Sequence, residues 1–483
     1  MTAAGLAAFM ALWSAWEAPN REGTRLQTEA KYQEAETYYL RAREALDATG
    51  RRDAPYGAVI NNLAALAQRM SRFQDAESGY REAVDIFKAS GRNFDRDRAR
   101  TMANLGALAM NQGRIADSFG WLEQARVIQQ RQRDVALGHT LLTLANLGLL
   151  KGDADLAAQS LAQARQAMDL FGRQPGDEAG FALTRCWLLT IQGNPTEASK
   201  ACDDAQPKVL AEYGATHPHN AMLELRRAQI AQDTGDLDKA ADSYRQAAVI
   251  YTRIYGESSI PYARATLGLA NIRRSQRQYG SALNLAQNSV RIFSSVSGSS
   301  GVDQMSALQL LGDIQRSQGQ TVQAENTIRR ALSLAKNTIG EDSGAAADVM
   351  NTLAATLFER PEGREEAGLL LERCIAIREA RFGGMHPSLS EPISNLGFVR
   401  LSEGKYEEAS HLFERSLGIR QQVLGTDHPS HAPVLAAYAD TLDHLQRKSQ
   451  AKWARSLARR LAQSPQNPAN QVLTFTNWKD QNK

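Results

Sequence analysis

The sequence is poor in the residues that build most other kinds of fold. Its 483 residues include 3 cysteines, 14 prolines and 7% aromatic residues. Three cysteines are too few for a disulfide framework or a zinc cluster. Few aromatic residues and few prolines, beside abundant alanine, favour helices over strands. No apolar run reaches the ~20 residues that a membrane-spanning helix needs. We therefore expect an all-α protein without a membrane span.

Neither sign of charge dominates. The chain has 56 Lys and Arg against 53 Asp and Glu, a net charge of +3. A nucleic-acid or membrane-surface partner normally requires a strongly basic face, which this balance does not indicate. We expect no nucleic-acid partner.

The first segment differs from the rest, because residues 1–16 (MTAAGLAAFMALWSAW) carry no charge. The apolar stretch has the length of a signal-peptide core, although no Lys or Arg precedes it and no small-x-small cleavage site follows. We expect residues 1–15 to be an export signal, which would place the protein in the periplasm or outside the cell. The alternative is an apolar capping helix on a protein that is not exported.

A period near 42 residues organises the chain from about residue 16 to residue 462. Phrases such as KYQEAE, RFQDAE and GKYEEAS align on one small residue, which we call the anchor. The anchors are Ala35, Ala76, Ser118, Ala157, Ala198, Ala240, Ala282, Ala324, Ala367, Ala409 and Ala451. A second small residue lies twelve positions before most anchors, and a third lies seven positions after. The pattern predicts eleven units of one kind.

Each unit has the sequence of a helical hairpin. A turn, often glycine, separates two periodic runs, as at Gly113, Gly152, Gly193, Gly235, Gly319 and Gly404. Glycine ends a helix without steric cost in the left-handed conformation, and small residues let two helices approach closely. One hairpin cannot bury its own apolar face, so stacked hairpins share a continuous core. We predict a right-handed α-solenoid of about eleven antiparallel hairpins over residues 16–462, with a tail over residues 463–483.

These residues resemble the tetratricopeptide repeat, which has a small residue, a turn glycine, an aromatic residue and an anchor alanine. The usual period of that family is 34 residues. The longer period here, with the phrases NNLAALAQ, GATHPHNA and GTDHPSHA, is similar to the kinesin-light-chain type of repeat. The resemblance implies a superhelix that serves as a platform for protein partners. It does not specify the partner, because such arrays bind many unrelated proteins.

The sequence contains no pattern that predicts catalysis. There is no glycine-rich phosphate loop and no G-x-S-x-G nucleophile elbow. His217, His386 and His428 each precede a proline, where an extended residue followed by proline begins a helix. The pairs His217–His219 and His428–His431 are closely spaced, but neither has a third residue nearby in sequence that could complete a metal site. We expect no enzyme, no metal and no cofactor.

In the family that the sequence resembles, ligands bind along the first helix of each hairpin. That correspondence gives a groove of Asn62, Asn104, Asn146, Arg226, Gln229, Asn271, Arg274, Arg316 and Asn395, with Thr143, Thr184, Trp187, Asp313 and Phe398 beside them. Asparagine amides could hold a peptide backbone, and the arginines could hold carboxylates. Few acids accompany Arg226, Arg274 and Arg316, with Asp233 and Asp313 the nearest candidates. The alternatives are a merely solvated polar face, or arginines that these acids already neutralise.

We therefore expect a non-catalytic scaffold or adaptor that binds an extended, acidic peptide or partner segment. Two alternatives stay open. One is a peptide-sensing regulator that closes on a small ligand, and the other is an accessory subunit of a separate enzyme. The oligomeric state is not predicted.

Two of the three cysteines lie in the fifth hairpin, where their pairing depends on how its two helices face each other. Cys186 takes the place of the small residue in its first helix, and Cys202 lies four residues after its anchor, Ala198. If the small residue opposes the anchor, Cys202 lies one turn beyond the best position for a bond. We expect two neighbouring, buried free thiols and an isolated Cys374. A disulfide would instead favour an oxidising compartment.

Overall fold

A computed structural model describes residues 14–29, 31–70, 72–295, 301–338 and 340–463. These residues form 22 α-helices and four short 3₁₀ helices, and no strand occurs among them. The α-helices are α2 (Glu17–Thr28), α3 (Tyr32–Asp47), α4 (Ala54–Arg69), α5 (Phe73–Ala89), α6 (Asp95–Asn111), α7 (Ile115–Arg131), α8 (Leu137–Lys151), α9 (Ala154–Phe171), α10 (Asp177–Ile191), α11 (Pro195–Tyr213), α12 (Pro218–Asp233), α13 (Leu237–Tyr255), α14 (Ile260–Ser275), α15 (Tyr279–Ser295), α16 (Gly301–Ser317), α17 (Thr321–Thr338), α18 (Gly344–Phe358), α19 (Arg364–Phe382), α20 (Ser390–Ser402), α21 (Tyr406–Leu424), α22 (Ala432–His444) and α23 (Lys448–Ala462). The 3₁₀ helices are η1 (Arg92–Phe94), η2 (Pro361–Gly363), η3 (Pro387–Leu389) and η4 (Pro429–His431).

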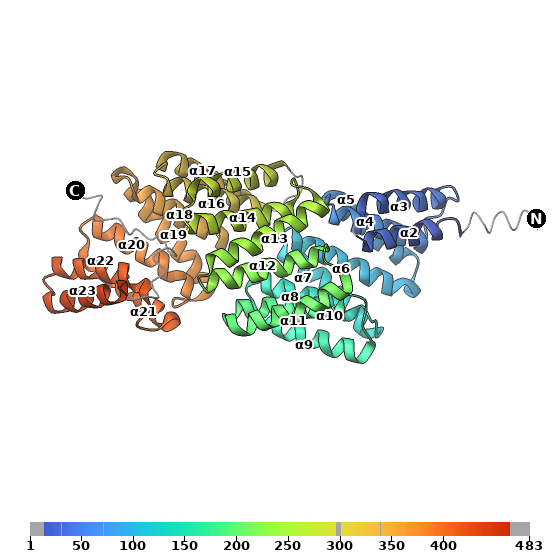
Figure 1. The fold of residues 1–483 in the computed structure, drawn as a ribbon, viewed down its shortest axis with the longest axis horizontal. Helices are drawn as coiled ribbons and strands as arrows, with labels where there is room; N and C mark the ends of the chain where they lie inside the picture. The colour runs from blue at the N-terminus through green and yellow to red at the C-terminus, as the bar shows by residue number, and fades with distance from the viewer. Residues whose placement is uncertain (1–13, 30, 71, 296–300, 339, 464–483) are drawn as a thin grey trace, which may run out of the picture. The chain divides into compact units, whose positions relative to one another are not determined.

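Consecutive helices pack in pairs, beginning with α2 and α3 and ending with α22 and α23 (Figure 1). This arrangement confirms the predicted all-α solenoid and its eleven hairpins. Within the described ranges, no helix is long and apolar enough to cross a membrane. The predicted export segment, except for its last residues, and nearly all of the predicted tail lie outside the described residues.

In the third to eighth, tenth and eleventh hairpins, the turn places the residue five before the anchor in the left-handed conformation. Gly113 and Gly404, for example, both have φ of 75°. In the seventh and eleventh hairpins the same position holds Arg277 and Gln446, and both have φ of 61°. A side chain with a β-carbon adopts this conformation at a cost of about 1–2 kcal/mol. The turn geometry therefore persists where the glycine is lost.

The three His-Pro sequences begin helices, as predicted. His217, His386 and His428 are extended, with ψ of 148°, 139° and 130°. In each case Nδ1 of the ring also accepts a hydrogen bond from the backbone N–H two residues on, at 3.3–3.4 Å. The histidine thus caps the helix that the proline begins.

The helices of a hairpin meet in a fixed register. The small residue of the first helix faces the residue sixteen positions later, which lies one turn beyond the anchor. A β-carbon added to Gly23 would lie 2.7 Å from the Tyr39 ring, and one added to Gly397 would lie 2.7 Å from the Phe413 ring. These two hairpins therefore pair a small residue with a large one.

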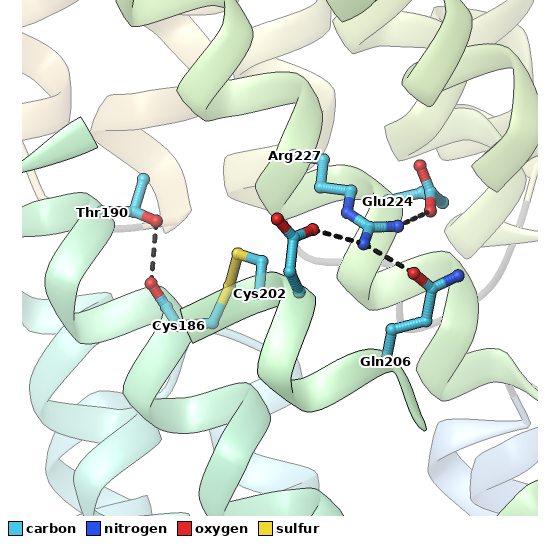
Figure 2. The surroundings of a disulfide bond; sticks show 7 residues. Cys186, Thr190, Cys202, Gln206, Glu224 and Arg227 are labelled. Carbon is cyan, nitrogen blue, oxygen red and sulfur yellow. Dashed lines mark hydrogen bonds and ion pairs between the residues drawn. A yellow bond between two sulfur atoms is a disulfide. The ribbon is translucent and has the colours of Figure 1, made fainter. Parts of the chain in front are cut away.

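This register corrects the prediction of two free thiols, because Cys186 and Cys202 form a disulfide. They occupy the facing positions that hold glycine and an aromatic residue in other hairpins, and their Cα atoms are 5.0 Å apart, within the usual range for a disulfide. The prediction placed the anchor, instead of the residue one turn after it, opposite the small residue. Figure 2 shows the bond between α10 and α11. Cys374 is free and buried, as expected.

The chain divides into two compact units within the seventh hairpin. Unit 1 comprises residues 1–269 and 291–300, and unit 2 comprises residues 270–290 and 301–483. In unit 2 most of the described core is one apolar cluster that runs from Met305 to Leu461, and a smaller cluster lies around Ala282 and Ile314. In unit 1 the apolar core is formed by several smaller clusters.

In unit 1 the first and sixth hairpins touch. The rings of Tyr32 and Tyr255 stack with their centroids 5.9 Å apart, and Ile254 packs against the same apolar cluster. One edge of this contact borders a cavity of about 520 Å³, which Lys31, Met70 and Ser258 help to line. We call this contact the seam. It closes the six hairpins of unit 1 on themselves.

Candidate functional site

The first helices of successive hairpins lie next to one another, as α8, α10 and α12 do in unit 1. We call the surface that they share the inner face of each unit. The predicted groove residues come from these helices, and the structure assigns them to three different settings.

The first setting is a ladder of side-chain amides that joins one hairpin to the next. Asn62 donates from Nδ2 to Oδ1 of Asn20, and Asn104 donates in the same way to Asn61, both at 3.0 Å. In unit 2, Asn395 donates to Asn351, also at 3.0 Å, and Asn395 is only 1% exposed. Paired asparagines such as those in NNLA serve both neighbours. These amides therefore bind the array to itself, which sequence reading did not anticipate.

The second setting holds polar residues that pair locally. Gln229 donates to Asp233 at 2.9 Å, and Arg274 donates to Oδ1 of Asn271 at 3.0 Å. Arg316 lies 3.7 Å from Asp313 and 3.4 Å from Glu359, and its side chain is 10% exposed. Sequence reading had included Asp313 but not Glu359, which belongs to the next hairpin.

The third setting is a cavity of about 100 Å³ in the inner face of unit 1, between α8, α10 and α12. Five residues that sequence reading placed in the groove line it, namely Thr143, Asn146, Thr184, Trp187 and Arg226. The structure adds lining residues that were not predicted, and those with polar or flexible side chains are His139, Tyr213, His219 and Met222. The structure therefore concentrates one part of the predicted groove in a single hollow.

Arg226 and Trp187 form the centre of this cavity. The Arg226 guanidinium lies 3.9 Å from the Trp187 ring centroid, a cation–π contact between α12 and α10. Burial lowers the pKa of Arg226 to about 10, so the group stays charged at neutral pH. In the part of the chain that the structure describes, no carboxylate forms an ion pair with it. The cavity thus presents a desolvated cation without a counterion.

Asn146 adds hydrogen-bond donors to the same cavity. Its Oδ1 accepts a hydrogen bond from the Thr184 hydroxyl at 3.1 Å. This fixes the amide so that the oxygen is used and the two N–H groups of Nδ2 stay available for a ligand. A ligand group that accepts hydrogen bonds matches this donor-rich lining.

One wall of the cavity is built from stacked rings. Tyr213 lies over His217 and against His219, at centroid distances of 4.3 and 4.5 Å. Burial, with a further effect of the Arg69 charge, lowers the pKa of His217 to about 4. Burial and the charges of His217, Arg69 and His139 lower the pKa of His219 to about 3. Both rings are neutral at pH 7. The available signal was the phrase GATHPHNA, in which sequence reading weighed His219 only as a metal ligand.

The disulfide holds α10, the helix that carries Trp187, against α11. Cys186 directly precedes Trp187 on α10, and both cysteines are 0% exposed. On the neighbouring helix, Arg227 donates to Glu224 at 2.8 Å and to Gln206 at 2.8 Å, which joins α12 to α11 (Figure 2). The helices that carry Trp187 and Arg226 are therefore fixed to one another through α11.

A metal centre has no support from the described residues, because they contain no group of three His, Cys, Asp or Glu side chains placed to hold an ion. The chemistry of the cavity is that of recognition through stacking, donated hydrogen bonds and positive charge.

Two family models, both described as tetratricopeptide repeat, match the sequence. One covers residues 98–131 and the other covers residues 220–295, 261–337, 303–380 and 389–452. No curated protein matches the sequence at a significant level.

Solved structures of similar arrays are distant in sequence. The apo form of the quorum sensor NprR from B. thuringiensis has a TM-score of 0.53 at 16% identity, over 76% of this chain and 99% of that chain. This likeness shows the fold alone. A kinesin light chain repeat array from P. anserina has a TM-score of 0.36 at 20% identity, over 43% of this chain and 99% of that chain. BtubC from P. vanneervenii has a TM-score of 0.40 at 17% identity, over 49% of this chain and 90% of that chain.

Proposed function

The chain belongs to the tetratricopeptide repeat family, and from that premise we propose that it is a non-catalytic scaffold whose unit 1 binds an extended, acidic segment of a protein partner. The observation that carries the proposal is the Arg226 guanidinium, stacked on Trp187 in a cavity where no described carboxylate pairs with it. A ligand carboxylate would supply the missing counterion and would accept hydrogen bonds from Arg226 and from the Asn146 amide.

The test begins with selection of binding sequences from a random peptide library displayed on phage. We expect enrichment of Asp and Glu. Against a selected peptide, Arg226→Gln should lower the affinity by about 1.5–3 kcal/mol, the contribution of a hydrogen bond to a charged group. The loss should shrink at high salt, because added ions screen the charge.

Arg245→Gln on α13 is the matched control. Arg245 is an exposed arginine that pairs with Asp242 on its own helix, so this substitution makes the same change of charge away from the cavity. Equal losses from Arg226→Gln and Arg245→Gln, or selection of peptides without acidic residues, would overturn the proposal.

A second candidate is a regulator that closes on a small ligand. The seam favours it, since a contact between the first and sixth hairpins can close or open around a bound molecule. Small-angle X-ray scattering with and without a selected peptide separates the candidates. A scaffold keeps its radius of gyration, whereas a regulator of this kind changes it.

We also propose that the chain folds in an oxidising compartment. The support is the Cys186–Cys202 disulfide, since such bonds persist mainly in exported proteins. This agrees with the predicted export signal in residues 1–15.

A further inference from the structure

The last described helix of unit 2 concentrates positive charge. The whole chain has a net charge of only +3, yet α23, with the sequence KSQAKWARSLARRLA, has five Lys and Arg side chains and no Asp or Glu. The net charge did not indicate this segregation, because it averages over all 483 residues. A helix with charges of one sign is a candidate surface for a partner of the opposite sign.

Carboxylates from neighbouring elements neutralise two of these five cations. Arg455 forms an ion pair with Asp443, and its Nη2 also lies 3.2 Å from Oδ1 of Asp440. Nη2 of Arg460 lies 2.7 Å from Oδ1 of Asp427. Across the part of the chain that the structure describes, no carboxylate forms an ion pair with the remaining three cations, which are Lys448, Lys452 and Arg459. Thus α23 retains three uncompensated charges.

The three uncompensated cations share the exposed side of α23. The helix packs on α22 and η4, and its buried residues are Ala451, Ala454, Ala458 and Leu461. Lys448, Lys452 and Arg459 are exposed, and they are spaced by four and seven residues, close to one and two turns of an α-helix. Their side chains consequently leave the helix in one direction, so that one flat partner can contact all three.

Trp453 adds a large apolar side chain beside these cations. It follows Lys452 and is 57% exposed, and of the described residues of α23 it is the one large apolar residue that is exposed. One tryptophan supplies at most about 250 Å² of apolar contact, whereas a stable protein interface buries about 800 Å² per partner. A tryptophan beside basic residues is instead typical of segments at a membrane surface, because its amphipathic ring suits the headgroup level.

We propose that the exposed side of α23 docks on a negatively charged lipid surface, where Lys448, Lys452 and Arg459 contact anionic headgroups and Trp453 enters the interface. A lipid surface presents its negative charge over a wide, flat area, which matches cations spread along one side of a helix. Each Lys or Arg near such a surface strengthens binding about fivefold. Such binding is peripheral and needs no membrane-spanning helix. It is independent of the peptide binding proposed for unit 1.

The experiment measures sedimentation of the full chain with vesicles of phosphatidylcholine alone and of phosphatidylcholine mixed with phosphatidylglycerol. Wild type should bind only the mixed vesicles, and high salt should weaken the binding because added ions screen the charges. Lys452→Gln combined with Arg459→Gln should weaken it roughly twenty-fivefold, about fivefold for each charge. The matched control combines Lys200→Gln with Lys208→Gln, which removes two exposed lysines from α11, and should leave the binding unchanged.

Trp453→Phe tests whether the ring enters the lipid. Brominated lipid chains quench the fluorescence of a tryptophan that contacts them. Wild type on mixed vesicles should be quenched, and Trp453→Phe should lose that quenching although five of the six tryptophans remain. Equal quenching of the two proteins would overturn the contribution of Trp453.

Lys452→Arg combined with Arg459→Lys separates charge from folding, because it keeps both cations and should bind mixed vesicles like wild type. A loss as large as that of the glutamine variant would refute the role of the charge. Wild type that binds neither kind of vesicle, or a glutamine variant that binds like wild type, overturns the proposal. Binding to polyglutamate or duplex DNA without binding to vesicles also overturns it, and so does vesicle binding only by a variant that ends at Gln463, since residues 464–483 would then cover the face. Arg226→Gln should not change vesicle binding, so this proposal and the proposed function fail separately.

Discussion

Removal of the Cys186–Cys202 disulfide should cost the fifth hairpin much of its stability. The bond closes a loop with a sequence separation of 16 residues. The loop-entropy model assigns about 3 kcal/mol to a loop of this length at 25 °C. Each hairpin of a solenoid is held mainly by its neighbours, so the loss should appear in the unfolding of unit 1.

The perturbation is the double substitution of Cys186 and Cys202 by alanine, and the assay is urea unfolding followed by circular dichroism. Cys374→Ala is the control, because alanine occupies that position in most other hairpins. A second variant, Cys186→Gly with Cys202→Phe, installs the glycine–phenylalanine pair of Gly397 and Phe413. It should recover part of the lost stability, because the phenylalanine ring fills the space that the glycine leaves.

Thiol counting checks the premise of this prediction. Alkylation of the denatured, unreduced protein should modify one cysteine, Cys374, and reduction should expose two more. Three modified cysteines before reduction would refute the disulfide. A double alanine variant as stable as wild type would refute the reasoning from loop entropy.

Three further predictions concern the turns, the histidines and the first residues. Arg277→Gly and Gln446→Gly should each stabilise the protein by roughly 1 kcal/mol in urea unfolding, because glycine adopts the left-handed turn without strain; an unchanged or lower stability would contradict this. The free energy of unfolding should fall as the pH drops from 6.5 to about 4, because His217 and His219 then bind protons in the unfolded chain but not in the folded one. His217→Asn, which keeps a helix-capping side chain, should reduce this dependence and leave the part that His219 contributes, and a slope equal to that of wild type would argue against His217 as a source. Sequencing of the mature N-terminus should begin well after Met1, whereas a chain that begins at Met1 or at the next residue rules out cleavage.

The fold was predictable because the contacts between paired helices demand small residues at fixed places. Ala35 and the ten later anchors recur for that reason, and the structure has a hairpin at each of them. The pairing of Cys186 with Cys202 was also readable in principle. Gly397 and Phe413 have the same spacing, and that small–large pair identifies the facing position.

The site was less predictable, because it depends on how hairpins follow one another. Trp187 and Arg226 lie in different hairpins, and their stacking depends on the rotation from one hairpin to the next. Glu359 directly follows the last residue of α18 in the ninth hairpin, and from there it reaches Arg316 in the eighth. Unit 1 closes on itself where Tyr32 of the first hairpin stacks on Tyr255 of the sixth. The pitch of the superhelix decides this closure, and no periodicity in the sequence encodes that pitch.

The amide ladder limits how this chain can change in length during evolution. Asn62 reaches Asn20 across 42 residues, Asn104 reaches Asn61 across 43, and Asn395 reaches Asn351 across 44. A duplication or deletion of one whole period brings equivalent asparagines back into contact, so the inherited bonds form again between new neighbours. An insertion of a few residues within a first helix would instead rotate an amide away from its partner and leave two hairpins unjoined. Growth and loss by complete hairpins is therefore the tolerated path, and shorter length changes belong in the loops.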